Sequence, residues 1–192
     1  MKVKKCEGVY LDFLLKKKYT RLMFSLKKRS LIDYSIITFC LVGIGFMSYL
    51  LRLHFLKGGN SICDFSSHFS CQIVNQSLYS EVLGIPVALF GLIYFFVVGV
   101  MVAGQFSKHT FRAIILFTLG SLVFSLYLSG IEYFYLGVVC LFCELSKIVM
   151  VSILLLSFVV HRRQGNRLQL FEVVASGVLG MSLVGASYFL QK

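Results

Sequence analysis

The sequence predicts an all-α integral membrane protein, and its composition, segment lengths and charge distribution all support that fold class. Of the 192 residues, 58% are hydrophobic, one is proline and none is tryptophan, and the mean hydropathy is +0.85. Such a composition lies well outside that of soluble domains. Each predicted span reaches the roughly 20 apolar residues that a helix needs to cross the hydrocarbon core. These spans are residues 31–56, 84–103, 111–135, 140–160 and 168–190.

Positive charge is concentrated at the amino terminus. The formal net charge is +11, and residues 2–29 hold ten of the nineteen lysines and arginines. Most of the others flank the ends of predicted helices, which is typical of a topology signal rather than of a nucleic-acid surface. Residues 1–30 are therefore predicted to be a basic cytosolic arm, with the basic connections 104–112 and 161–167 on the same side. Residues 57–83 and the carboxyl terminus are then exported.

The exported connection at residues 57–83 contains Cys63 and Cys71. It is 27 residues long, and connections of this length in compact bundles are usually functional. After Cys71, apolar residues recur every four positions, which predicts a short helix resting one face on the bundle or the bilayer. Those residues are Val74, Leu78 and Val82. The connection is expected to form a lid, and His68 within it is predicted to be a solvated loop residue.

Small residues in two of the spans are predicted to allow close helix contact. They are Gly84, Ala88 and Gly91 in the second span and Gly177, Gly180 and Gly185 in the fifth.

A second cysteine pair, Cys140 and Cys143, stands where the fourth span begins. Cysteines three residues apart on a helical turn can close a disulfide, and the amino-terminal end of a helix favours the thiolate that exchanges with other disulfides. Zinc usually takes four ligands, often from two such pairs. The sequence has no second Cys-x-x-Cys pair but offers a second dithiol in Cys63 and Cys71, so a redox relay is favoured over zinc. The remaining cysteines, Cys6 and Cys40, are expected to lie outside that relay.

In this order and spacing, the sequence resembles bacterial members of the vitamin K epoxide reductase family. The matching residues are Cys63-x7-Cys71, Ser77, the segment Gly84-Ile85-Pro86-Val87, Tyr127-Leu128, Phe134 and Cys140-x-x-Cys143.

The resemblance implies a four-helix transmembrane bundle around a quinone site, with a fifth transmembrane helix as in many bacterial members. Many of those members continue into a fused thioredoxin-like domain, whereas this chain stops after the fifth span. A separate thioredoxin-fold (DsbA-like) carrier is therefore expected as the partner. The resemblance also implies a multi-pass protein of the bacterial inner membrane whose active site faces the periplasm.

The resemblance assigns a role to each cysteine. Cys143 would react with the quinone, ubiquinone or menaquinone; Cys140 would exchange with Cys71; and Cys63 would exchange with the carrier. Ser77, Tyr127, Glu132 and Phe134 are the expected quinone contacts. Each also fits a structural role: a loop hydrogen bond for Ser77, an interfacial carboxylate for Glu132, and packing for the two aromatic residues. No metal ligand is assigned.

The predicted function is therefore thiol–disulfide oxidoreduction that oxidises a carrier protein and passes electrons to a membrane quinone. One alternative is reduction of vitamin K epoxide or quinone in an endomembrane. Lys147 argues against it, because it stands where the vertebrate enzymes of the family carry a tyrosine linked to vitamin K chemistry. The other alternative is a non-enzymatic membrane protein whose cysteines bind Cu(I) or zinc.

Overall fold

A computed structural model describes residues 30–56, 62–64, 68–82, 84–104, 109–163 and 170–190. The basic arm with Cys6 lies outside the described residues, as does part of each of the two basic connections.

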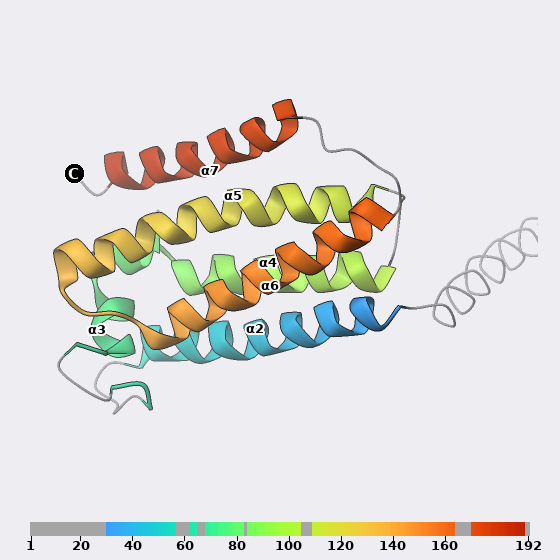
Figure 1. Ribbon diagram of the computed structural model, residues 1–192. Helices are drawn as coiled ribbons and strands as arrows, with labels where there is room; N and C mark the ends of the chain where they lie inside the picture. Colours follow the sequence, from blue (N-terminus) through green and yellow to red (C-terminus); the bar gives the residue numbers. More distant parts are fainter. Residues whose placement is uncertain are drawn as a thin grey trace, which may run out of the picture.

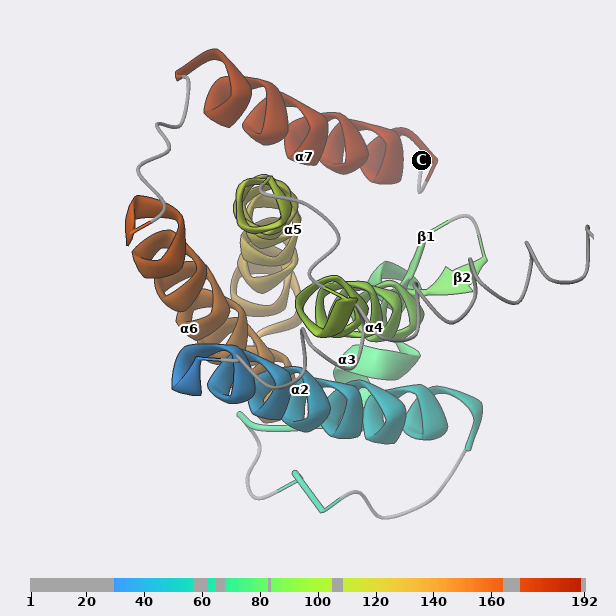
Figure 2. The same ribbon diagram turned by 90° about the vertical axis from the view of Figure 1, so that its right-hand side faces the viewer.

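The described chain is an all-α bundle, as predicted. Its long helices are α2 (Leu31–Phe55), α4 (Val87–Gly104), α5 (Thr110–Ile131), α6 (Leu141–Arg163) and α7 (Leu170–Leu190). Each begins and ends within four residues of its predicted span. They alternate in direction along the bundle (Figure 1), and the end view shows α7 on the outer side of α5 (Figure 2).

Among the residues that the structure describes, four helical segments are long and apolar enough to cross a membrane: Leu31–Phe55, Val87–Gly104, Thr110–Leu136 and Leu141–Arg163. The third combines α5 with a π-helical turn, η2 (Glu132–Leu136), which ends at Gly137 with φ 63°. In α7 the apolar stretch found among the described residues is the shorter Phe171–Ser182. The protein is therefore a multi-pass membrane protein with four spanning helices and a fifth, adjoining apolar helix.

The start of α2 shows why the first span begins where the apolar run begins. Ser30 and Asp33 form a capping box, in which the Asp33 carboxylate accepts a hydrogen bond from the Ser30 N–H over 3.2 Å. This pairing satisfies amide groups that have no partner within the helix. Arg52 and His54 occupy the last turn, where positive charge complements the helix dipole.

The connection between α2 and α4 contains α3 (Cys71–Gln76), a 3₁₀ turn η1 (Leu78–Ser80), and the paired strands β1 (Glu81–Val82) and β2 (Ile85–Pro86). The prediction that helical periodicity runs on to Val82 is wrong. The helix ends because Ser77 is extended (φ −73°, ψ 158°), and its N–H and hydroxyl both donate to the Val74 carbonyl. Gly84 (φ 76°) lies in the turn between the strands rather than on α4, so it is not a helix contact.

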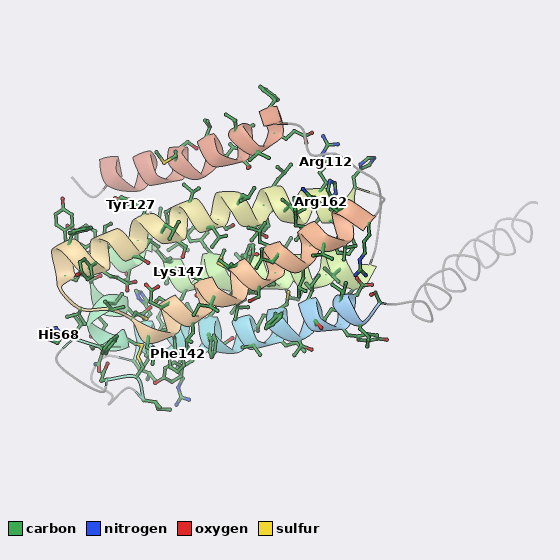
Figure 3. The ribbon with its side chains drawn as sticks, viewed as in Figure 1. His68, Arg112, Tyr127, Phe142, Lys147 and Arg162 are labelled. Carbon is green, nitrogen blue, oxygen red and sulfur yellow. A yellow bond between two sulfur atoms is a disulfide. The ribbon has the colours of Figure 1, made fainter. Side chains whose placement is uncertain are left out.

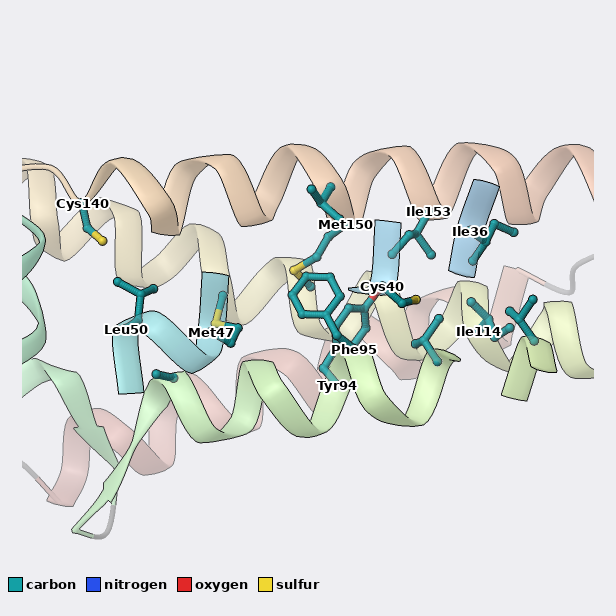
Figure 4. Close-up of a cluster of buried hydrophobic side chains, with 14 of the residues drawn as sticks. Ile36, Cys40, Met47, Leu50, Tyr94, Phe95, Ile114, Cys140, Met150 and Ile153 are labelled. Atoms are coloured by element: carbon teal, nitrogen blue, oxygen red, sulfur yellow. The ribbon is translucent and has the colours of Figure 1, made fainter. Parts of the chain in front are cut away.

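The centre of the bundle is closely packed around Phe95 of α4, which is fully buried (Figure 4). Lipid is as apolar as the helices, so burial alone does not hold spanning helices together and close fit matters more. A Cβ added at Gly43 of α2 would meet the Phe95 ring at 2.5 Å, and one at Gly91 would meet Met47 Sδ at 2.5 Å. Gly91 is therefore a contact position, as predicted.

Helix α7 approaches α5 through small residues. A Cβ added at Gly180 would meet the Gly120 carbonyl oxygen at 2.6 Å, whereas one at Gly177 would meet nothing within 4 Å. The predicted contact at Gly180 is confirmed and that at Gly177 is wrong, because the two glycines point to different sides of α7. The side-chain surroundings of Gly185 lie outside the described part of the chain.

Replacing Gly180 by alanine is expected to lower the melting temperature in detergent, because the added methyl meets backbone that cannot swing aside. Gly177→Ala is the matched control. It adds the same methyl to the same helix in open space, and should leave stability unchanged or raise it by about 0.5–1 kcal/mol through helix propensity. Equal effects of the two substitutions would contradict the described packing of α7.

Candidate active site

Both predicted cysteine pairs lie at the same end of the bundle. Cys63 and Cys71 form a disulfide with Cα atoms 5.8 Å apart, and Cys140 and Cys143 are free thiols whose sulfurs are 2.7 Å apart. Figure 3 shows His68 and Phe142 at this end and Arg112 and Arg162 at the other. Within the described residues, no group of three or more His, Cys, Asp or Glu side chains is placed to hold a metal ion.

The cysteine loop is docked onto the segment that leads into α6. Phe69 and Val139 form a parallel β-bridge, and the Val139 N–H donates to the His68 carbonyl over 2.9 Å. Paired strands lie about 4.8 Å apart. Because Cys71 follows Phe69 by two residues and Cys140 follows Val139 by one, this pairing brings the two cysteines to neighbouring positions.

The loop cysteines are fully enclosed at this junction. Cys63, Cys71 and Cys140 each have 0% of their surface exposed, and they belong to one buried cluster. The loop disulfide is therefore packed into the same buried region as the start of α6. A protein thiol can reach Cys63 only if the loop moves.

Glu132 fixes the backbone of the inner pair. Its side chain is buried, and Oε2 accepts a hydrogen bond from the Cys140 N–H over 2.9 Å. The π-helical turn that Glu132 begins places this carboxylate next to the first turn of α6. Three residues after Cys140, the Cys143 N–H donates to Cys140 Sγ over 3.4 Å. This bond strengthens when the sulfur carries negative charge.

A cavity of about 690 Å³ extends from the inner pair into the bundle. Its walls are almost entirely apolar, and several polar side chains line it close to the inner pair. That volume and lining are typical of a small-molecule site with a few orienting groups. The apolar length fits an isoprenoid chain and the polar side chains fit a quinone ring, so the residues present fit a quinone. The polar lining residues near the inner pair include Ser77, Glu132, Cys143, Ser146 and Lys147.

The structure brings two of the four predicted quinone contacts to this cavity, Ser77 and Glu132. The described side chains that line it include neither Tyr127 nor Phe134. Tyr127 is half-buried on α5, and Phe134 is 81% exposed. The π-helical turn explains the second displacement, because its wider spacing rotates successive side chains away from the positions that an α-helix would give them.

A cluster of three polar side chains, Lys147, Glu144 and Ser129, lies beside Cys143, and the sequence did not predict that these three residues would meet. Lys147 is buried, and its Nζ donates to Glu144 Oε1 and Ser129 Oγ. Ser129 Oγ in turn donates to Glu144 Oε1 over 3.0 Å. The i, i+3 spacing of Glu144 and Lys147 is visible in the sequence, but the contribution of Ser129 depends on how α5 packs against α6.

The fold and the two cysteine pairs define a multi-pass membrane protein with thiol–disulfide chemistry at one end of its bundle. Comparison with protein families matches residues 34–158 to the vitamin K epoxide reductase family, so the chain belongs to that family. The match contains all four site cysteines and leaves α7 outside. It identifies the protein as a membrane oxidoreductase of the thiol–disulfide and quinone type. No curated protein gave a match.

Replacing Glu132 by alanine is expected to destabilise the start of α6 by about 1–3 kcal/mol, because the buried Cys140 N–H loses its acceptor. Glu132→Gln keeps an acceptor oxygen and should cost clearly less. Melting temperatures in detergent would show the difference, with Tyr133→Ala, which truncates an exposed neighbour, as the control. If alanine and glutamine behave alike, the hydrogen bond does not hold this junction.

Proposed function

We propose that the protein oxidises a thioredoxin-fold carrier outside the cytosol and passes the two electrons to a membrane quinone, so that exported proteins acquire disulfides. The observation that carries the proposal is the position of the inner pair. Cys143 lines an apolar cavity, while Cys140 directly follows Val139, which pairs with the cysteine loop at Phe69. One pair of thiols therefore adjoins both a site for a lipid-soluble acceptor and a second disulfide.

The outer steps are thiol–disulfide exchange at the loop pair. A thiolate of the reduced carrier attacks Cys63, a carrier–Cys63 disulfide forms, and Cys71 is released as a thiolate. The second carrier thiol then displaces Cys63, and the carrier leaves oxidised. Because Cys63 is fully buried, the loop must open for this step.

The inner steps move the same electrons to the cavity. The Cys71 thiolate attacks Cys140 of the oxidised inner pair and releases Cys143, and Cys63 then displaces Cys140 by re-forming the loop disulfide. Cys140 and Cys143 now hold two electrons and two protons as thiols. A bound quinone supplies the acceptor for both, and the inner pair returns to its disulfide.

The charge distribution supports a bacterial inner membrane with the cysteines on the periplasmic face. The described basic residues Arg112, Arg162 and Arg163 lie at the end of the bundle opposite the cysteine loop (Figure 3). Positive residues favour the cytosolic side, and disulfides persist on the oxidising side.

Purified protein supplied with a reduced thioredoxin-fold carrier is expected to reduce a short-chain ubiquinone or menaquinone, followed by quinone absorbance. Cys63→Ala should abolish oxidation of the carrier but spare much of the oxidation of dithiothreitol, since a small thiol can reduce the inner pair directly. Equal loss of both activities would contradict the division between the two pairs. Metal bound to the purified protein with no quinone reduction would instead favour the metal-binding alternative.

Cys143→Ser is expected to accumulate a Cys71–Cys140 disulfide, because Cys143 can no longer attack Cys140 and only Cys63 is left to resolve the bond. Non-reducing digestion and mass spectrometry of cells expressing the variant would detect the bond. A membrane-impermeant reductant added to spheroplasts should cleave it if the loop faces outward.

Two further variants define the trapped bond. Adding Cys71→Ser must remove it, whereas Cys40→Ser, a cysteine buried in α2, must not. A Cys63–Cys140 bond would reverse the order within the loop, and protection from the reductant would invert the proposed topology.

A further inference from the structure

A buried ammonium group lies one helical turn beyond the inner cysteine. Cys143 and Lys147 are four residues apart on α6, so they share one face of the helix, and both line the cavity. Figure 3 shows Lys147 within the bundle at the cysteine end. A positive charge is thus fixed on the wall of a cavity that is otherwise almost entirely apolar.

The cluster of Glu144, Ser129 and Lys147 that holds this charge extends from the protein surface to the buried ammonium group. The Glu144 side chain is 40% exposed, whereas that of Lys147 is 9% exposed. Glu144 and Ser129 both bind Nζ and bind each other, so they hold the ammonium group in a fixed position. The ion pair between Glu144 and Lys147 does not by itself require a cavity beside it. A charged group within a membrane span is costly unless it has partners or a function.

Cations placed where negative charge develops accelerate reactions in sites that exclude water. When a dithiol reduces a carbonyl-type acceptor, negative charge develops on the acceptor oxygen. Glu132, whose side chain also lines the cavity, accepts a hydrogen bond from the Cys140 N–H. Among the described lining residues, Lys147 is the cation available to that oxygen.

We propose that Lys147 is a catalytic residue of the acceptor step. Its ammonium group donates a hydrogen bond to the acceptor oxygen of a quinone in the cavity and balances the charge that develops there as Cys140 and Cys143 are oxidised. Glu144 and Ser129 are positioning residues for the ammonium group. The inference rests on the proposed function. It leaves the electron and proton balance of the acceptor step unchanged, because both electrons and both protons still come from the thiols.

The competing explanation is that Lys147 only neutralises Glu144. The two roles separate in a double variant. Lys147→Met alone leaves Glu144 without its cation, whereas Lys147→Met with Glu144→Gln removes the pair as a unit. A purely structural lysine predicts that the double variant recovers full activity, and a catalytic lysine predicts that it stays as slow as Lys147→Met.

The test measures turnover, ligand affinity and thiol exchange separately. With a short-chain ubiquinone and a short-chain menaquinone, turnover of Lys147→Met and of the double variant should fall roughly 10²-fold, as for loss of one donor to developing charge. Lys147→Arg should keep turnover within about tenfold, because it retains charge and donors. Quinone affinity by equilibrium dialysis should change far less than turnover. Stoichiometric reduction of the loop disulfide by the carrier without quinone should be unchanged.

Ile148→Ala, which truncates the exposed neighbour on α6, is the matched control and should behave as wild type. Wild-type turnover in Lys147→Met, or recovery in the double variant, overturns the role of Lys147 while leaving the proposed function intact. Failure of the wild-type protein to reduce either quinone overturns the proposed function and this role with it. If Lys147→Met does not fold, Lys147→Arg and the double variant decide the question.

Discussion

The structure depends on how the first amide groups of α6 find hydrogen-bond partners at the membrane mouth. Unpaired backbone groups are costly where water is scarce, so each must be satisfied by protein. The Val139 N–H uses the loop carbonyl of His68, the Cys140 N–H uses Glu132, and the Cys143 N–H uses Cys140 Sγ. These three bonds tie the loop, the end of the third span and the inner pair together. The positions of the cysteines are thus consequences of satisfying one helix terminus.

The spanning helices could be predicted from the sequence because two independent signals end at the same residues. Apolar runs set their length, and polar or basic residues such as Ser30 and Arg163 mark where the runs stop. The connection after Cys71 was harder, because a four-residue apolar spacing does not encode the break at Ser77. That break depends on a local serine hydrogen bond that competes with the helix. Gly84 was predicted to lie on a helix because an apolar sequence does not distinguish a glycine that forms a turn from a glycine at a helix–helix contact.

The residues of the candidate site also fall into those that the sequence predicts and those that it does not. The cysteines were identifiable because their chemistry and spacing are local, and Ser77 and Glu132 do line the cavity. Phe134 faces outward because a π-helical turn changes the direction of side chains, which periodicity cannot reveal. The Lys147 cluster was missed because its third member, Ser129, comes from another helix. Features that depend on the rotation of one helix against another are beyond a single sequence.

The two ends of the cavity place opposite demands on the same helix. Near Cys143, α6 must present polar and charged groups, which the bilayer disfavours, and further along it must pack as an apolar span. In the first two turns the polar groups have partners on the π-turn, on α5 and within α6: the Cys140 N–H bonds Glu132, Lys147 bonds Ser129, and Ser146 bonds the Cys143 carbonyl. Beyond Lys147, buried residues such as Met150 and Ile153 contribute to the apolar core. Redox chemistry at the mouth and packing within the membrane are therefore served by successive segments of one helix.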